Sequence, residues 1–297
     1  MSGLDVWRGA VLLRWRVSYW CNYDCSYCNQ DHRRRAHAFD KHPPDVWIKA
    51  LKDNFGRLKL ALIITGGEPM LDLDNMHRFL SALLPLPFVD NVRIDTNISW
   101  NPDLYKDLPC KEKVFFNCSL HPFQTSFPKF LVRIKRVLEY GFHIGMVNYV
   151  MHPDQIGKYE HFKKELAKYG LPLNPNPDWN IMPSVELLKI LSMTLSPLDL
   201  YFKCGGQTKG RSCLYPTLAY QMHYNGNLNV GCFPNVRGNI FKNKIPKRPS
   251  ASVACPNSWC GCLDKYSFIE GVNRNSSLNL LKIYGNILRK NLGIKKM

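Results

Sequence analysis

Three cysteines stand close together near the start of the chain, at Cys21, Cys25 and Cys28. Thiolates bind both iron–sulfur clusters and zinc, so this spacing indicates a metal site. Three thiolates on one loop can hold three irons of a [4Fe–4S] cube and leave the fourth iron open to another ligand. A structural zinc site would need a fourth protein ligand, for which His32 or His37 is available.

A glycine-rich segment, Thr65 to Pro69, follows the apolar run Leu60 to Ile64, which we expect to be a buried strand. Gly66 and Gly67 can expose backbone groups to a ligand. Glu68 can accept a hydrogen bond from an ammonium group. An ordinary strand-to-helix turn is the alternative interpretation of this segment.

The two motifs together, a C-x3-C-x2-C loop and a later Gly-Gly-Glu-Pro, resemble the signature of the radical S-adenosylmethionine (SAM) superfamily. The resemblance implies a [4Fe–4S] cluster on the three cysteines, with SAM on its open iron. It places Tyr27, the aromatic residue before the last cysteine, near the adenine of SAM. It assigns Gly66, Gly67 and Glu68 to the methionine amino group of SAM.

Polar residues also follow the next two expected strands, at 91–95 and 113–119. In relatives such residues line the ribose and carboxylate of SAM, which makes Asn97 and Ser119 the candidates here. Caps at the strand ends are the alternative. His121, which precedes a proline, could be an acid or base that faces the substrate, or a structural residue.

These motifs need a scaffold that brings strand ends together. From residue 11 to 182, short apolar runs alternate with longer amphipathic stretches. We expect strands at 11–18, 60–64, 91–95, 113–119, 142–150 and 173–182, and helices after Pro43 and at 75–84, 130–140 and 156–169. This alternation predicts an α/β fold with a parallel sheet, and the resemblance implies a partial (β/α)6 TIM-like barrel. Active sites in such sheets lie at the C-terminal ends of the strands.

The chain after residue 195 is loop-rich and carries six further cysteines. A turn at 224–226 between short apolar runs predicts a β-hairpin, which would bring Cys213 and Cys232 together. This arrangement resembles the SPASM and Twitch extensions of radical SAM enzymes. Six cysteines are too few for the two clusters of a full SPASM domain, so the resemblance implies one auxiliary [4Fe–4S] cluster.

The expected ligands of that auxiliary cluster are Cys213, Cys232, Cys255 and Cys260, with Cys262 competing for the last place and Cys204 left over. A structural zinc site is the alternative. We expect a radical SAM barrel at 1–195 and a small cysteine-containing C-terminal extension at 196–297. The amphipathic stretch at 278–288 is expected to be a packing helix.

The formal net charge is +17, from 40 Lys and Arg against 23 Asp and Glu. Such a field attracts anionic partners, although a lysine-rich solvated surface explains the charge equally well. The basic residues are dispersed and form no nucleic-acid module, so nucleic acid is not the expected partner. No apolar stretch is long enough to span a membrane, and a cytoplasmic location is the default expectation.

The resemblance implies an enzyme that reductively cleaves SAM to methionine and a 5′-deoxyadenosyl radical, which abstracts hydrogen from a substrate. It also implies an electron donor such as flavodoxin or ferredoxin, and an auxiliary cluster that assists oxidation or binds substrate. Peptide-modifying relatives often carry an N-terminal leader-binding domain, whereas only ten residues precede the first expected strand here. We therefore expect a small polar substrate, such as a sugar, aminocyclitol or nucleotide, and the basic charge is compatible with a phosphorylated one.

Two other functions remain open at this stage. A peptide substrate is the first. The second is of another class, a non-catalytic zinc- or iron-binding module that uses its basic surface on nucleic acid.

Overall fold

The first two thirds of the chain alternate parallel strands with helices. The computed structural model describes residues 10–28, 35–178, 180, 184–193, 195, 197–204, 206–260 and 268–269. The strands in this part are β1 (Ala10–Ser18), β2 (Lys59–Gly66), β3 (Val89–Thr96), β4 (Val114–Leu120), β5 (His143–Met151) and β6 (Leu173–Pro177). The helices are α1 (Pro44–Phe55), α2 (Leu73–Leu83), α3 (Phe127–Glu139), α4 (Tyr159–Ala167), α5 (Val185–Ser192) and α6 (Pro197–Lys203).

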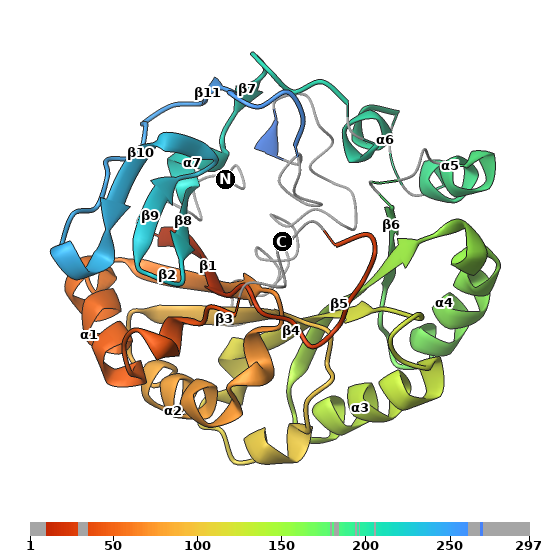
Figure 1. The fold of residues 1–297 in the computed structure, drawn as a ribbon, viewed down its shortest axis with the longest axis horizontal. Coiled ribbons are helices and arrows are strands. Elements are labelled where there is room, and N and C mark those ends of the chain that lie inside the picture. Colours follow the sequence, from red (N-terminus) through yellow and green to blue (C-terminus); the bar gives the residue numbers. More distant parts are fainter. Residues whose placement is uncertain are drawn as a thin grey trace, which may run out of the picture.

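Shorter elements follow in the last third. They are β7 (Ser212–Cys213), α7 (Tyr215–Leu218), β8 (Ala219–His223), β9 (Asn227–Val230), β10 (Phe233–Asn239) and β11 (Val253–Ala254). Nine strands form one sheet in the order β10-β9-β8-β1-β2-β3-β4-β5-β6. Neighbours from β8 through β1 to β6 pair in parallel, while β8, β9 and β10 pair antiparallel. The sheet curves, with α1 to α4 around its outer side (Figure 1).

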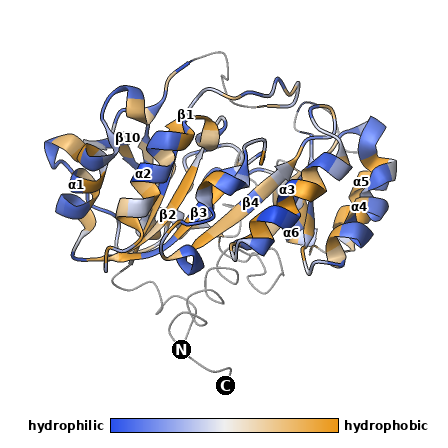
Figure 2. Cartoon of the chain, turned by 90° about the horizontal axis from the view of Figure 1, so that it is seen from below, coloured by the Kyte–Doolittle hydropathy of each residue, from blue (hydrophilic) through white to orange (hydrophobic). Residues whose placement is uncertain are grey.

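The two faces of the sheet differ because side chains alternate along each strand. On β1, Leu13 and Trp15 are fully buried in the main core beneath the helices. Arg14 and Arg16, between and beyond them, therefore lie on the inner face. In Figure 2 the strands β2 to β4 are mostly hydrophobic, whereas the helices combine hydrophilic and hydrophobic faces. The expected α/β fold with a partial TIM-like barrel is confirmed.

Two of the differences from the predicted boundaries have a clear physical reason. The helix expected at 156–169 divides into a 3-10 helix, Pro153–Lys158, followed by α4. Gly157 lies at the junction, and glycine has a low helix propensity. The sixth strand ends at Pro177 rather than at 182. Its prolines cannot donate ladder hydrogen bonds, and they are tolerated because β6 is an edge strand.

The predicted turn at 224–226 is confirmed, because β8 and β9 pair directly across it. Gly226 has a φ of 80°, a conformation that glycine adopts without the steric cost other residues pay. The hairpin extends the barrel sheet, because β8 lies beside β1. Cys262 and the helix expected at 278–288 lie outside the described residues. None of the helices in the described part of the chain is both long and apolar enough to cross a membrane.

Candidate active site

The loop with the first three cysteines is held against the end of β2. The amide of Gly67 donates to the carbonyl of Ser18 at 2.9 Å, and the amide of Glu68 donates to the carbonyl of Trp20 at 2.8 Å. A Cβ atom on Gly67 would lie 2.2 Å from the Trp20 oxygen. The glycine is therefore required for the close approach of β2 to the chain that enters the cysteine loop.

The carboxylate of Glu68 joins the ends of β2 and β3. It accepts hydrogen bonds from the Met70 amide at 3.0 Å, the Thr96 hydroxyl at 2.7 Å and the Asn97 amide at 2.7 Å. The residue is 1% exposed, and burial raises the pKa of the carboxyl to about 7 although the three donors oppose this. The carboxylate thus positions Asn97, and its expected contact with the amino group of SAM stays a prediction.

Asn97 reaches the cysteine loop. Its side-chain amide donates to Oδ1 of Asn22 at 3.0 Å and lies 3.8 Å from Sγ of Cys21. The backbone amide of Tyr23 approaches the same sulfur at 3.4 Å. Two N–H donors therefore face Cys21. Ser119 lies farther along the sheet, half-buried at the end of β4 and paired in register with Asn148.

His121 directly follows β4 and packs against the same loop. Its Nδ1 lies 2.8 Å from the Tyr27 hydroxyl and 3.7 Å from Sγ of Cys25. The ring stacks on Tyr27 with centroids 5.8 Å apart and meets the edge of Tyr23. Burial lowers the pKa of His121 to about 4, which keeps the imidazole neutral. Sequence reasoning left its role open, although its position at a strand end matched that of Asn97.

The three cysteines suit a cationic cluster. Cys21 is half-buried, Cys25 is buried and Cys28 is exposed. Burial raises the thiol pKa of Cys21 to about 11 and that of Cys25 to about 12. Bound iron would supply the positive charge that keeps such sulfurs deprotonated, and thiolates are the ligands that [4Fe–4S] clusters take.

A zinc site at this loop would need a fourth protein ligand. Nδ1 of His37 accepts from the Phe39 amide at 3.2 Å, so that ring nitrogen caps a short 3-10 turn. His32 lies outside the described residues. Among the residues that the structure describes, no three Cys, His, Asp or Glu side chains gather closely enough to hold a single metal ion.

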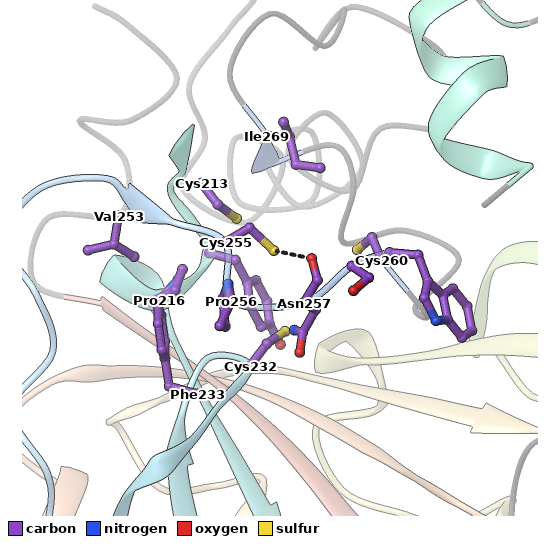
Figure 3. Close-up of a pocket in the computed structure, with 13 residues that line it drawn as sticks. Cys213, Pro216, Cys232, Phe233, Val253, Cys255, Pro256, Asn257, Cys260 and Ile269 are labelled. Atoms are coloured by element: carbon purple, nitrogen blue, oxygen red, sulfur yellow. Dashed lines mark hydrogen bonds between the residues drawn. The ribbon is translucent and has the colours of Figure 1, made fainter. Parts of the chain in front are cut away.

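The later cysteines line a second site. A cavity of about 420 Å³ is bounded by Cys213, Cys232, Cys255 and Cys260 (Figure 3). These are the four ligands expected for the auxiliary cluster. Val253 of β11 pairs with Cys213 of β7, and the amide of Cys255 donates to the Arg211 carbonyl at 2.8 Å, which brings two of the segments together.

The hairpin brings Cys232 to the same cavity, since this cysteine lies two residues after β9 and its sulfur accepts from the side-chain amide of Gln221 at 3.5 Å. Cys204 packs against the main core instead. Aromatic and apolar side chains complete the wall, among them Tyr215, Phe233 and Ile269.

Residues 15–116 match the family model of the radical SAM superfamily. This chain contains a radical SAM domain. The matched residues run from β1 into β4 and include the three cysteines, the glycine motif and Asn97. The radical SAM enzyme expected from the sequence is therefore confirmed at the level of the superfamily.

Solved structures agree with the fold described above. Histidine-tagged anSMEcpe with bound AdoMet has a TM-score of 0.54 and 14% identity, over 78% of each chain. Native anSMEcpe with bound AdoMet and the Cp18Cys peptide has a TM-score of 0.53 and 14% identity, over 78% of this chain and 77% of that one. No curated protein matches the chain. At this identity the likeness shows the fold alone.

Proposed function

We propose that the chain is a radical SAM enzyme whose catalytic [4Fe–4S] cluster is held by Cys21, Cys25 and Cys28. With SAM bound, this cluster supplies the reductive cleavage that yields a 5′-deoxyadenosyl radical able to abstract hydrogen from a substrate. The observation that carries the proposal is the meeting of the cysteine loop with the Gly66–Gly67 segment at the C-terminal ends of β1 and β2. An electron donor such as flavodoxin or ferredoxin is part of this proposal.

The protein's own residues have positioning tasks in this scheme. Glu68 fixes the start of the segment after β3, which places the amide of Asn97 beside Cys21. Asn97 and Ser119 stand at the strand ends where the carboxylate and ribose of SAM are expected. The glycine motif keeps the cysteine loop against the sheet, so the cofactor sites share one rigid support.

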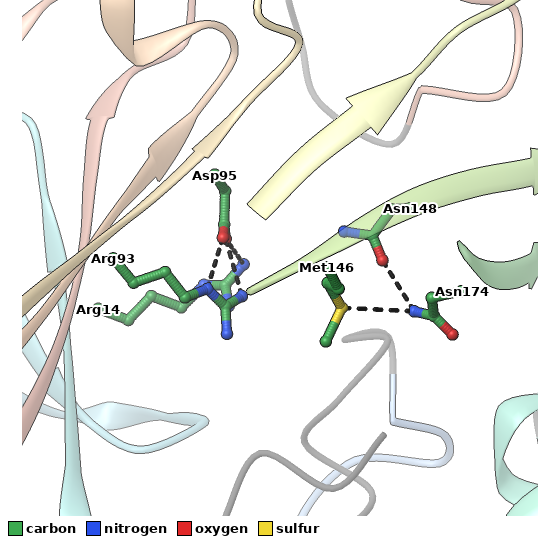
Figure 4. A network of polar contacts seen from close by, with 6 residues as sticks. All are labelled: Arg14, Arg93, Asp95, Met146, Asn148 and Asn174. Atoms are coloured by element: carbon green, nitrogen blue, oxygen red, sulfur yellow. Dashed lines mark hydrogen bonds and ion pairs between the residues drawn. The ribbon is translucent and has the colours of Figure 1, made fainter. Parts of the chain in front are cut away.

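The inner face of the barrel supports a small polar substrate. On one side Arg93 forms hydrogen bonds of 2.6 and 3.1 Å with Asp95, and Arg14 lies 3.8 Å from the same carboxylate (Figure 4). On the other side Asn174 donates to Oδ1 of Asn148 at 2.8 Å. Two guanidinium groups and a row of amides are suited to hydroxyl, amine and anionic groups of a ligand.

Buried amide oxygens on the same face add to this argument. Within the described part of the chain, Oδ1 of Asn117 and Oδ1 of Asn176 have no hydrogen-bond partner, although both residues are at most 2% exposed. An unsatisfied buried acceptor costs about 1–3 kcal/mol, which a ligand hydroxyl or amine would recover. A sugar, aminocyclitol or nucleotide carries such donors, and a phosphate on it would suit the arginines.

A peptide substrate is the second candidate. It is favoured by the likeness to anSMEcpe, whose structure has been solved with a bound peptide. The two candidates differ in an observable way, because a small ligand that protects the barrel from thermal unfolding supports the first, whereas protection by peptides alone supports the second.

The cavity lined by four cysteines supports an auxiliary [4Fe–4S] cluster as part of the proposal. Four thiolates are also a complete ligand set for zinc, so the metal must be counted. About eight irons in each chain would support two clusters, whereas four irons with one zinc would contradict the auxiliary cluster.

The test of the main proposal is anaerobic reconstitution followed by reduction in the presence of SAM. We expect a brown protein that releases 5′-deoxyadenosine. Replacing Cys21, Cys25 and Cys28 with Ala should abolish this release and remove about four irons while the second metal stays bound. A colourless wild-type protein that binds nucleic acid would instead favour the non-catalytic alternative.

A further inference from the structure

Three polar groups form a triangle beside the first cysteine site. The Tyr27 hydroxyl lies 2.8 Å from Nδ1 of His121 and near enough to the sulfur of Cys25 to lower the pKa of that thiol, against the larger effect of burial. Nδ1 of His121 lies 3.7 Å from that sulfur. The triangle joins the cysteine loop to the end of β4, which are 94 residues apart along the chain.

The hydrogens of this triangle can be assigned from the chemistry of its members. An iron-bound thiolate can only accept hydrogen bonds, so Cys25 needs donors around it. If Nδ1 of His121 carried a lone pair, it would face the sulfur with no hydrogen between them. A hydrogen on Nδ1 can instead be donated to the Tyr27 oxygen, which leaves the phenol hydrogen for the sulfur. Tyr27 has that hydrogen to give, because a phenol is protonated at neutral pH.

We infer that Tyr27 and His121 form a hydrogen-bond relay that ends on the sulfur of Cys25 and raises the reduction potential of the cluster. This inference rests on the proposed function, since it requires a [4Fe–4S] cluster at this loop. The direction follows from charge, because reduction adds an electron and a hydrogen bond to a ligand sulfur stabilises that added negative charge. His121 acts as a positioning residue that orients the phenol through its Nδ1 hydrogen and its stacked ring.

The relay gives Tyr27 a task different from that of its aromatic ring alone. A ring placed only to contact adenine would work equally well as phenylalanine. The hydroxyl is needed only if it donates to the sulfur. Tyr23 offers a matched comparison, because it is a second tyrosine of the cysteine loop whose ring meets the edge of the His121 ring.

The test is a potentiometric titration of the reconstituted protein, followed by electron paramagnetic resonance. The cluster at Cys25 is identified as the signal that changes when SAM is added, which separates it from any auxiliary cluster. We expect Tyr27→Phe to retain iron and to shift this potential to a more negative value. Tyr23→Phe should leave the potential unchanged. Equal potentials in wild type, Tyr27→Phe and Tyr23→Phe would overturn the relay.

Two histidine variants keep the test decisive if Tyr27→Phe fails to bind iron. His121→Phe should lower the potential, while His121→Gln, whose amide can still donate, should keep it closer to the wild-type value. Equal potentials in both variants would contradict the relay, and so would loss of iron without any change in the potential of the remaining cluster. If the wild-type protein itself assembles no [4Fe–4S] cluster, the proposed function fails together with the inference.

Discussion

Replacing Glu68 with Gln tests how the two strand ends at the site are joined. Oε1 of Glu68 accepts from the Met70 amide and the Thr96 hydroxyl, and Oε2 accepts from the Asn97 amide. The side-chain nitrogen of glutamine must replace one of these oxygens. If the glutamine oxygen takes the place of Oε1, which accepts two hydrogen bonds, the NH2 group takes the place of Oε2 and faces the backbone N–H of Asn97. The buried hydrogen bond from the Asn97 amide is then lost.

Leaving one buried donor unsatisfied costs about 1–3 kcal/mol. For a chain of this size, about 2 kcal/mol lowers Tm by roughly 4–8 °C. The assay is thermal unfolding of the metal-free protein followed by circular dichroism, with Glu112→Gln as an exposed control. A Tm for Glu68→Gln within about 1 °C of the control would refute the reasoning, because the hydrogen bonds of Glu68 would then not stabilise the junction of β2 and β3.

The pH dependence of the same variant gives an independent check. Burial raises the pKa of Glu68 from 4.5 to about 7, so the native state holds a proton that the unfolded state releases in this interval. The stabilising contribution of Glu68 is therefore complete below about pH 4.5 and is lost as the pH rises through 7. We expect the Tm difference between wild type and Glu68→Gln to be larger at the acidic end of this range. A Tm difference that grows with pH would contradict this, because it would show that the three donors lower the pKa of Glu68 by more than burial raises it.

Two further predictions concern the metal sites. Gly67→Ala should displace the cysteine loop, because its Cβ would lie 2.2 Å from the Trp20 oxygen, and we expect a loss of iron from the first site. Gly157→Ala, which has open space around its Cβ, is the control, and equal iron contents in the two variants would contradict this role. Cys232→Ala should remove the metal of the second cavity and leave SAM cleavage at the first site detectable, as measured by metal analysis and 5′-deoxyadenosine release. Unchanged metal content would exclude Cys232 as a ligand.

The sequence was sufficient to predict the alternating strands and helices, because their periodicity is local. It also predicted that four of the later cysteines would belong together, and Cys213, Cys232, Cys255 and Cys260 do line one cavity. This worked because the turn at Gly226 fixes the hairpin and so the position of Cys232.

Contacts between distant segments were not predictable in the same way. The pairing of Tyr27 with His121 depends on how the cysteine loop folds over the end of β4. The residues next to Tyr27 and His121 in the sequence give no sign that the cysteine loop and the end of β4 lie together. The buried hydrogen bonds of Glu68 were missed for a similar reason, since the motif suggested a ligand contact while the fold supplies donors from Thr96 and Asn97.

The pairing of β1 with β8 has a consequence for biosynthesis. β1 leads into the first cysteine loop and is an inner strand of the sheet, flanked by β2 and by β8. Leu13 pairs with Tyr220, so one neighbour of β1 is translated about two hundred residues after it. Contacts of such long sequence separation form late in folding. The support of the first cysteine loop is therefore complete only after residues 219–223 have left the ribosome, and we expect iron to be inserted after that point rather than before it.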